Sequence, residues 1–416
     1  MAGVPKRRRR AAISGVYTTA QSQSASSRYG LSYALEAITG ALAEANLGKR
    51  DIQGLYAAID GWPQLHGPSS SRYDATNWAT LLGVPLRWLT GSVNSGNGSG
   101  VSALLDAAAA IESGYIDTAV IAAGMSAHRP GATAPWTVPT DPLTDWLGSF
   151  SAAQFALVAR RYMHVYGATV EQFAAAASTI RNYGSINPDA VFSRSGPYSV
   201  QDILDAPMVA DPLTRLMCAP ANNGGAAIVV TTLERARDGT QAPVVVLGGA
   251  DQAVYPAYAE APLLEHPAGG PFPTRWVDDA FGRSEVSRDD VDVVQLYDSF
   301  APWVLMQWEL LGYCLPGEGG AFVESGVMAV DGRWPTCTDG GCSSFSDFGV
   351  PAILRPIEAV RQLRGQVADD CPGWRDGVHT HRPGQCRQAR DPRVGLAVGM
   401  GPPTGGGQLV IVAKDR

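Results

Sequence analysis

The sequence predicts a layered α/β protein made of two similar halves. Residues 89–124 read as a short apolar run, a turn of Gly, Ser and Asn, an Ala-rich helix and a second apolar run. This order is typical of a strand, a tight turn, a helix and a strand. A short strand that follows a polar turn occurs twice, at 50–60 and at 288–300. Similar units at matching places indicate an internal duplication, with strands that cross over through helices in each half.

The first half, 11–240, alternates predicted strands with predicted helices. Its patterns predict a strand, two helices and two further strands, at 11–17, 31–46, 101–113, 118–123 and 226–232. Between 125 and 211 the sequence changes to loops rich in Pro, Trp, Thr and Asp, followed by helical segments at 151–166 and 169–182. An insertion of loops and helices this long between core strands usually covers a binding site.

The second half, 241–416, repeats the alternation. Strands are expected at 243–249, 291–297, 394–399 and 408–412, and helices at 302–311 and 353–364, the latter despite Pro356. The segment 365–393 interrupts this half and carries four possible zinc ligands, Cys371, His379, His381 and Cys386. Their intervals match no zinc-ribbon or zinc-finger pattern, so a mobile insertion is favoured over a structural zinc site.

The composition bounds the class of protein. A chain of 416 residues with 45% hydrophobic side chains can bury one large core or two smaller ones. The net charge of −7 argues against nucleic acid as the main partner, and no apolar run reaches the length of a membrane span. The basic segment 1–10 is expected to be a disordered, solvated tail.

The cysteine residues and the overall amino-acid usage indicate where the protein works and what kind of organism encodes it. Six Cys residues are scattered through a chain without a recognisable signal peptide, which favours reduced thiols in the cytoplasm. Arg, Ala, Gly and Pro are abundant and Lys is scarce, a bias typical of a high-GC bacterial coding sequence. We therefore expect a soluble bacterial protein.

Three stretches in one order resemble the thiolase superfamily. They are VNSGNGSGVSALLDAAAAIESGYIDTAVIAAG, then VVQLYDSFAPWVLMQWELLGYCLPGEGGAFVE, and then TDGGCSSFSDFG followed by EAVRQLRG. Within the superfamily they are most similar to the sterol-carrier and lipid-transfer branch, whose members often lack the nucleophilic Cys. The similarity extends from about residue 11 to residue 412. It implies the thiolase fold, in which two duplicated halves form the layers αβαβα.

The resemblance places Asn97 where thiolases have the Cys that accepts the acyl group. A carboxamide cannot form an acyl-enzyme at neutral pH, but it can donate two hydrogen bonds. Asn97 therefore either helps to hold a thioester oxygen, together with the backbone of Gly98 and Ser99, or only shapes the turn. The second thiolase Cys, expected in the loop before Gly401, is also missing.

At the next position that matches the thiolase active site, this chain has a Tyr. Thiolases have Asn or His at the position of Tyr297 in LYDSF, and a Tyr there resembles the steroid side-chain aldolases. In those enzymes a second Tyr lies in the Gly-Gly loop, which Gly340 and Gly341 form here, and its place falls on Asp347. The alternative is a vestigial site in which Tyr297 is a packing residue.

The implied chemistry is an aldol or retro-aldol reaction on a β-hydroxyacyl-CoA, without an acyl-enzyme. The acyl group would be a lipid, a steroid side chain or a polyketide-like chain. Donors at 97–100 and near Gly401 would stabilise the enolate oxygen. Free Asp ionises near pH ~4 and free Tyr near pH ~10, so Asp347 would start as the base and Tyr297 as the acid. Coenzyme A enters as the thioester substrate, and no bound cofactor or metal is expected.

Two other functions stay open. A non-catalytic acyl-CoA or lipid-binding protein would keep the fold and lose the chemistry. A Claisen or acyltransfer enzyme would use Cys337, which stands where this branch usually has an Asn. No His lies nearby in the sequence to activate Cys337, and a small packed thiol beside the substrate is the commoner case.

The resemblance also implies two partners. One is a second copy of the chain, in a homodimer whose sheets extend or pack across a two-fold axis through the strand 118–123. The other is a small protein of the DUF35 class, with an OB-fold and a zinc ribbon. Such a protein would complete the acyl-binding tunnel.

Overall fold

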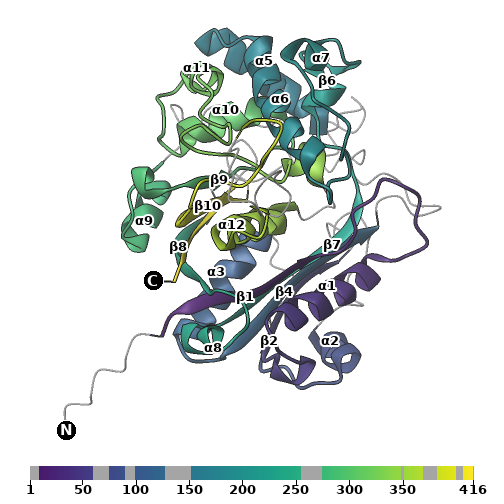
Figure 1. Cartoon of the computed structure of the whole chain (residues 1–416), viewed down its shortest axis with the longest axis vertical. Helices are drawn as coiled ribbons and strands as arrows, with labels where there is room; N and C mark the ends of the chain where they lie inside the picture. The colour runs from purple at the N-terminus through teal and green to yellow at the C-terminus, as the bar shows by residue number, and fades with distance from the viewer. Residues whose placement is uncertain are drawn as a thin grey trace.

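The computed structural model of the protein describes residues 9–59, 75–89, 99–126, 151–253, 274–347, 351–368, 382–399 and 406–415. Within these ranges, one mixed sheet has the strand order β3-β2-β4-β7-β1-β8-β11-β10-β9. Its strands are β1 (Ala11–Thr18), β2 (Gly54–Ile59), β3 (Trp88–Leu89), β4 (Thr118–Ser126), β7 (Asn223–Thr232), β8 (Val244–Ala253), β9 (Val293–Gln295), β10 (Val394–Val398) and β11 (Gly406–Lys414). Figure 1 shows these strands crossing the molecule with helices packed around them.

The sheet consists of two halves with the same pairing pattern. In the first half, β4 pairs in parallel with β2 and antiparallel with β7. In the second half, β10 pairs in parallel with β9 and antiparallel with β11. The halves join where β1 and β8 run antiparallel, with Ala12 opposite Val245 and Ile13 opposite Val244. This mirrored order confirms the predicted duplication and the layered α/β fold.

The two similar sequence units form the same local structure. A 3₁₀ turn, η1 (Lys49–Asp51), precedes β2, and η6 (Arg288–Asp290) precedes β9. Each turn ends in an Asp whose carboxylate accepts a backbone N–H from three residues earlier, over 2.8 Å in η1 and 2.7 Å in η6. An acidic side chain satisfies the free N–H groups at such a turn, which explains why the same residue type recurs.

Helices form the layers on either side of the strands. α1 (Gly30–Glu44) packs on β4 and β7, and α9 (Arg275–Ser284) packs on β8 and β11. α3 (Ser99–Glu112) and α12 (Leu354–Arg364) each pack on strands of both halves. In β4, Val120 faces the core around α1 and Ile121 faces the core around α3. β4 is therefore buried on both faces, as a continuous apolar run predicts.

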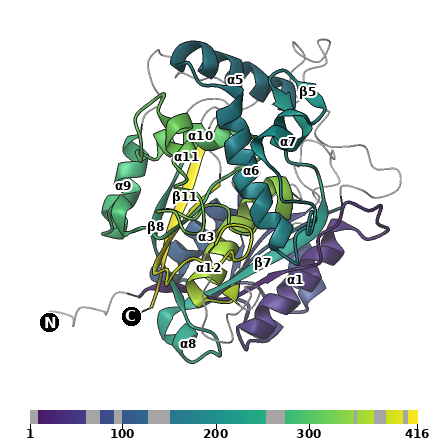
Figure 2. The same cartoon turned by 45° about the horizontal axis from the view of Figure 1, so that its top comes forward.

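The insertion between β4 and β7 lies at the top of the views in Figures 1 and 2. It contains α5 (Ser151–Tyr166), α6 (Val170–Ile186), α7 (Val200–Leu204) and a hairpin of β5 (Met208–Ala210) and β6 (Leu213–Thr214). α6 begins at a capping box formed by Thr169 and Gln172. α10 (Ala301–Leu310) and α11 (Gly319–Glu324) of the second half pack against α6, so the insertion and the second half share one core.

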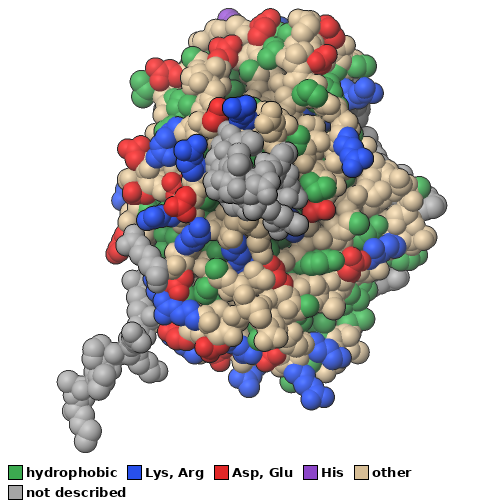
Figure 3. Space-filling view, viewed as in Figure 1, with side chains coloured by type: hydrophobic (Ala, Val, Ile, Leu, Met, Phe, Trp, Pro, Cys, Tyr) green, Lys and Arg blue, Asp and Glu red, His purple; other side chains and the backbone are tan. Residues whose placement is uncertain are grey.

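The strands and helices expected in the described ranges are present, with ends that differ by a few residues. The sequence patterns did not predict α7, α9, α11 or the β5–β6 hairpin, nor α2 (Ala75–Leu82) and α8 (Leu233–Arg237). None of the described helices is long and apolar enough to span a membrane. On the part of the face in Figure 3 that the described residues form, Lys and Arg side chains are interspersed with Asp and Glu.

The predicted position of the dimer axis is wrong. Residues 118–123 belong to β4, which is paired on one side with β2 and on the other side with β7. Every residue of β4 is buried. A strand with both ladders satisfied and both faces covered offers nothing to a second copy of the chain.

Two expectations about the terminal and inserted segments also need correction. Residues 1–8 lie outside the described residues, but Arg9 pairs with Asp117 and the Arg10 carbonyl accepts the Leu233 N–H at 2.8 Å, so these two residues belong to the fold. In the segment 365–393, residues 369–381, including Cys371, His379 and His381, lie outside the described residues. Its end at 386–389 is buried, and Cys386 is disulfide-bonded, so neither mobility nor a reduced thiol holds there.

Candidate functional site

The Gly-Gly loop has a shape that only glycine permits. A segment that includes Thr336 and Cys337 pairs with β9, and the chain then turns into a short π-helix, Gly341–Phe345. Gly340 and Gly341 have φ angles of 105° and 63°, in the left-handed region. A Cβ atom at Gly340 would lie 2.5 Å from the Gly184 Cα atom of α6, and one at Gly341 would lie 2.2 Å from a carboxylate oxygen of Asp298. The loop is therefore pressed between the insertion and the chain that follows β9.

Tyr297 lies two residues after the end of β9, with 2% of its surface exposed. Its backbone N–H donates to the Gln307 side chain at 3.0 Å, and the Gln307 amide donates back to its carbonyl at 2.7 Å. Gln307 is fully buried on α10. The backbone at Tyr297 is therefore fixed on both sides by one side chain, in the same core as Cys337.

Asp298, the next residue, binds the Gly-Gly loop. Its carboxylate accepts the Cys342 N–H at 2.6 Å, and the N–H and hydroxyl of Ser343 at 3.1 Å and 2.7 Å. Arg355 on α12 lies 3.9 Å from Asp298 and donates to Asp339 at 3.3 Å and 3.1 Å. Burial opposes the charge of Arg355, but Asp339, with Cys342, Cys337 and Asp298, raises the pKa of Arg355 above its ordinary value.

Asp347 ends the described part of this loop and is 7% exposed. Its carbonyl accepts the Asn222 N–H at 2.9 Å, and its own N–H donates to the Asn222 side-chain oxygen at 3.0 Å when that amide is oriented to satisfy its neighbours. The preceding Ser346 hydroxyl donates to Gln21 at 2.8 Å. Asp347 is thus held by residues just before β7 and after β1, both from the first half of the chain.

The start of α3 lies against the segment that follows Asp347. A Cβ atom at Gly100 would lie 2.6 Å from the Ile353 backbone nitrogen. Ile353 ends a 3₁₀ turn, Pro351–Ile353, only a few residues after Asp347. Both helix α3 and helix α12 therefore begin near the Gly-Gly loop, and a helix N-terminus favours a developing negative charge.

The structure describes some of the predicted substrate-binding residues and not others. Asn97, Gly98 and Gly401 fall outside the described residues, and of Ser99 only its place at the start of α3 is described. Gly340 and Gly341 are described, and their N–H groups are engaged within the loop, by the Cys337 carbonyl at 2.9 Å and by Asp339 at 2.8 Å. These two glycines contribute the shape of the loop, and their N–H groups are not available to a substrate oxygen.

Cys337 is buried completely. Its Sγ atom donates to the Leu296 carbonyl at 3.4 Å. Burial, reinforced by the nearby Asp298 carboxylate, raises the pKa of the Cys337 thiol well above its ordinary value. The thiolate is the nucleophilic form of cysteine, so this environment works against the acyltransfer alternative.

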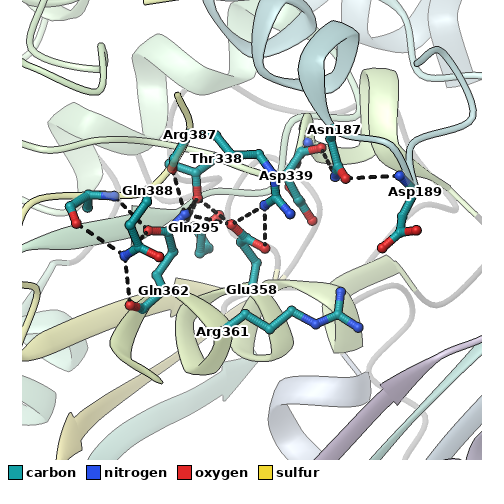
Figure 4. A network of polar contacts seen from close by, with 12 residues as sticks. Asn187, Asp189, Gln295, Thr338, Asp339, Glu358, Arg361, Gln362, Arg387 and Gln388 are labelled. Carbon is teal, nitrogen blue, oxygen red and sulfur yellow. Dashed lines mark hydrogen bonds and ion pairs between the residues drawn. The ribbon is translucent and has the colours of Figure 1, made fainter. Parts of the chain in front are cut away.

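A buried polar network that the sequence analysis missed supports the loop from α12, as Figure 4 shows. The Thr338 hydroxyl donates to Glu358 at 2.6 Å, and Arg387 lies 3.2 Å from the same oxygen. From the other side, the Asn187 amide donates to the Asp339 carbonyl at 2.8 Å. The sequence contains no clear signal for this network, because α12 also carries Arg361, Gln362 and Arg364, and its polar residues together are typical of a solvated face. Among the described residues, no group of His, Cys, Asp and Glu side chains is arranged to hold a metal ion.

Comparison with known proteins agrees with this geometry. Residues 275–380 match the family described as thiolase C-terminal domain-like. The chain is 32% identical over 381 residues to the 17-hydroxy-3-oxo-4-pregnene-20-carboxyl-CoA lyase of Mycobacterium tuberculosis, covering 87% of this chain and 94% of that protein. It is 29% identical over 379 residues to the steroid side-chain-cleaving aldolase of Thermomonospora curvata, covering 85% and 90%.

Solved structures of similar proteins also have the thiolase fold. The Ltp2-ChsH2(DUF35) aldolase matches with a TM-score of 0.80 and 27% identity over 98% of both chains. The acetyl-CoA acetyltransferase of Syntrophomonas wolfei matches with a TM-score of 0.66 and 16% identity, over 98% of this chain and 100% of that one, and so shares the fold. The chain belongs to the thiolase superfamily, in the thiolase-like branch that includes the steroid side-chain aldolases.

Proposed function

We propose that the protein is a carbon–carbon lyase that cleaves or forms a β-hydroxyacyl-CoA by a retro-aldol or aldol reaction. The observation that carries this proposal is the match, over nearly their whole lengths, to two enzymes whose names state lyase and side-chain-cleaving activity. The name of the first places a hydroxyl group and a CoA thioester on one steroid substrate. A steroid or similarly bulky lipid acyl group is therefore the substrate class that we favour.

In the cleavage direction, the Asp347 carboxylate takes the proton of the β-hydroxyl group. The α–β bond breaks, its electron pair passes to the thioester as an enolate, and Tyr297 gives its proton to the α-carbon. The products are a ketone or aldehyde and a shorter acyl-CoA. The enzyme is reset when the proton on Asp347 passes to Tyr297, directly or through water. Donors at the start of α3 and in the loop near Gly401 serve the enolate oxygen in this scheme.

The surroundings of the two residues support these roles. Tyr297 and Asp347 are both largely buried, and each has its backbone N–H and carbonyl held by a single partner, Gln307 and Asn222 respectively. Proton transfer requires such fixed geometry. The Cys337 thiol is less suited to acyl transfer, because it donates to the Leu296 carbonyl and burial raises its pKa, which disfavours the thiolate.

We further propose a DUF35 partner and a homodimer, for a reaction in the bacterial cytoplasm. The DUF35 proposal rests on the match to the Ltp2-ChsH2(DUF35) aldolase over 98% of both chains. For the homodimer, β3 is the outermost strand of the first half and replaces β4 as the strand at which two sheets would meet. Co-expression with a DUF35 protein should raise the yield or the activity of this chain, and light scattering should give the mass of a dimer.

The deciding experiment is incubation with a steroid or lipid β-hydroxyacyl-CoA, followed by mass spectrometry of the products and of the protein. Cleavage to a carbonyl compound and a shorter acyl-CoA, with no mass added to the protein, supports the proposal. An acyl group on Cys337 would favour acyl transfer. Tight binding without turnover, with the DUF35 partner present, would favour a lipid-binding protein.

A further inference from the structure

We propose that Asp298 is a positioning residue that fixes Tyr297 relative to the Gly-Gly loop and thereby to Asp347. The proposal rests on the proposed function, in which Tyr297 transfers a proton. Asp298 itself faces the loop backbone, and its own carboxylate is occupied by three donors. It therefore acts through its neighbours and has no direct part in the chemistry.

The first argument is the set of hydrogen bonds at the turn. Three successive backbone N–H groups, of Gly341, Cys342 and Ser343, donate to carboxylates, the first to Asp339 and the other two to Asp298. These groups lie at the start of the short helix Gly341–Phe345, where backbone N–H groups have no partner within the helix. The position of the turn is therefore decided by where the two carboxylates stand.

The second argument is the closeness of the contact. A single methyl group at Gly341 would overlap the Asp298 carboxylate, at 2.2 Å from one oxygen and 2.4 Å from the other. Asp298 is bonded covalently to Tyr297, whose backbone is held by Gln307 on the opposite side. The contact between Asp298 and Gly341 and the hydrogen bonds between Tyr297 and Gln307 are both close. A shift of the Asp298 carboxylate therefore displaces the loop, the Tyr297 backbone, or both.

The third argument is charge. Asp298, Asp339 and Arg355 place two negative charges and one positive charge in a site where each side chain is at most 3% exposed. A buried charge that is not balanced is unfavourable for folding. The substitution Asp298→Asn would leave the Arg355–Asp339 pair intact and make the cluster neutral, so stability alone does not explain the carboxylate. Its advantage is that both oxygens accept, whereas an amide has only one accepting oxygen.

The test is Asp298→Asn in the full-length protein, with its DUF35 partner, on the substrate that the wild type turns over. In either orientation, the amide nitrogen faces the Cys342 or the Ser343 donors, so the turn has to move. A misplacement of about 1 Å can reduce turnover about 100-fold. We expect kcat to fall at least about tenfold, with KM and melting temperature close to those of the wild type.

Asp290→Asn is the matched control. Asp290 lies on the same approach to β9 and accepts a backbone N–H and a hydroxyl from one residue, Ser287, at 2.7 Å each. It is exposed, and the hydrogen bonds described for it go to Ser287 and not to the loop, so its loss should leave kcat unchanged. Should Asp298→Asn fail to fold, Ser343→Ala removes only the 2.7 Å hydroxyl bond to Asp298 and should still lower kcat by about threefold.

The outcomes separate this inference from the proposed function. A wild-type protein without lyase activity rejects the proposed function. An active wild type together with an unimpaired Asp298→Asn variant rejects only the positioning role. An equal loss in the Asp290→Asn control, or a folded Ser343→Ala variant with wild-type kcat when Asp298→Asn cannot be made, rejects it as well.

Discussion

At the scale of single residues, Tyr297 provides the most direct test of the lyase reaction. Tyr297→Phe removes one oxygen and keeps the packing of the ring, so the loss of general acid catalysis should lower kcat about 100-fold or more. Turnover and melting temperature are measured together. Tyr162→Phe is the control, because Tyr162 is fully buried and its hydroxyl bonds to Glu309, a residue outside the Gly-Gly loop. That variant should lose stability and keep its turnover.

Asp347→Asn tests the base. The substitution keeps the shape and removes the carboxylate, so kcat should fall by an amount comparable to that in Tyr297→Phe. In the double variant the two losses should not multiply, because groups that act as one unit are not additive. The same kinetic assay of all three variants measures this. Near-normal turnover in both single variants would reject the lyase mechanism and leave a lipid-binding function.

The motifs made Tyr297 and Asp347 visible in the sequence, whereas Asp298, Arg355 and Glu358 were not. A charged residue in a helix with several polar residues reads as a solvent-exposed position unless its partner is known, and here the partners are distant in the sequence. Arg355 meets Asp339 and Asp298, and Glu358 meets Arg387. Only the fold brings these groups together, so no local pattern could indicate them.

At the scale of elements, the Gly-Gly loop gives a prediction with a built-in control. Gly341→Ala adds a methyl group in a left-handed backbone, where it also overlaps Asp298 at 2.2 Å. Gly365, just after α12, has a similar φ angle of 72°, but a methyl group there would meet nothing within 4 Å. Gly365→Ala should therefore cost only the backbone strain of about 1 kcal/mol and keep its activity. Gly341→Ala should cost more and lose most of its turnover.

Thermal unfolding and the lyase assay decide this comparison. If Gly341→Ala and Gly365→Ala lose equal stability and both remain active, the contact between the loop and Asp298 is not tight. Activity lost in both variants would point to a general effect of left-handed alanine residues.

Helix α9 is an element that the sequence patterns do not predict. Its buried residues, Trp276, Val277, Ala280 and Phe281, follow the spacing of one helical face. The local sequence does not predict this helix, because it follows a stretch rich in Pro and Gly and contains charges and Gly282. The sequence predicts α12, but it does not predict that the polar residues of α12 are buried. They are buried because the end of the inserted segment, at Arg387 and Gln388, packs over them, and this contact is not visible in the sequence of α12.

At the scale of the whole molecule, stability should depend on pH in the alkaline range. Burial raises the pKa of Cys218 from its ordinary value of 9.0 to about 12. The folded protein therefore holds this proton more tightly than the unfolded chain does, so its contribution to stability is complete below pH 9 and is lost as the pH rises from 9 to 12. Melting curves of the wild type and Cys218→Ser should converge over this range. Parallel curves would contradict the shift.

The sequence predicted the architecture of the sheet correctly, but not the position of a dimer axis. The duplicated units at 50–60 and 288–300 indicated a mirrored sheet, and the strand order confirms it. The prediction that 118–123 lies at a dimer axis was wrong, because a buried central strand and an edge strand can both be apolar. β4 differs from an edge strand only through its two neighbours, β2 and β7, which its own sequence does not specify.

The mirrored sheet also has an evolutionary consequence. An ancestral gene for one half would have encoded a self-complementary protein, in which two copies joined as β1 and β8 do now. Its symmetric assembly would have carried the same residues at the starts of both central helices. Joining two such copies in one chain removes that constraint, and each half can then specialise. In the sequence, one helix start follows Asn97 and the other follows Asp347. A single chain with two matching halves can thus hold different chemistry at the two matching helix starts.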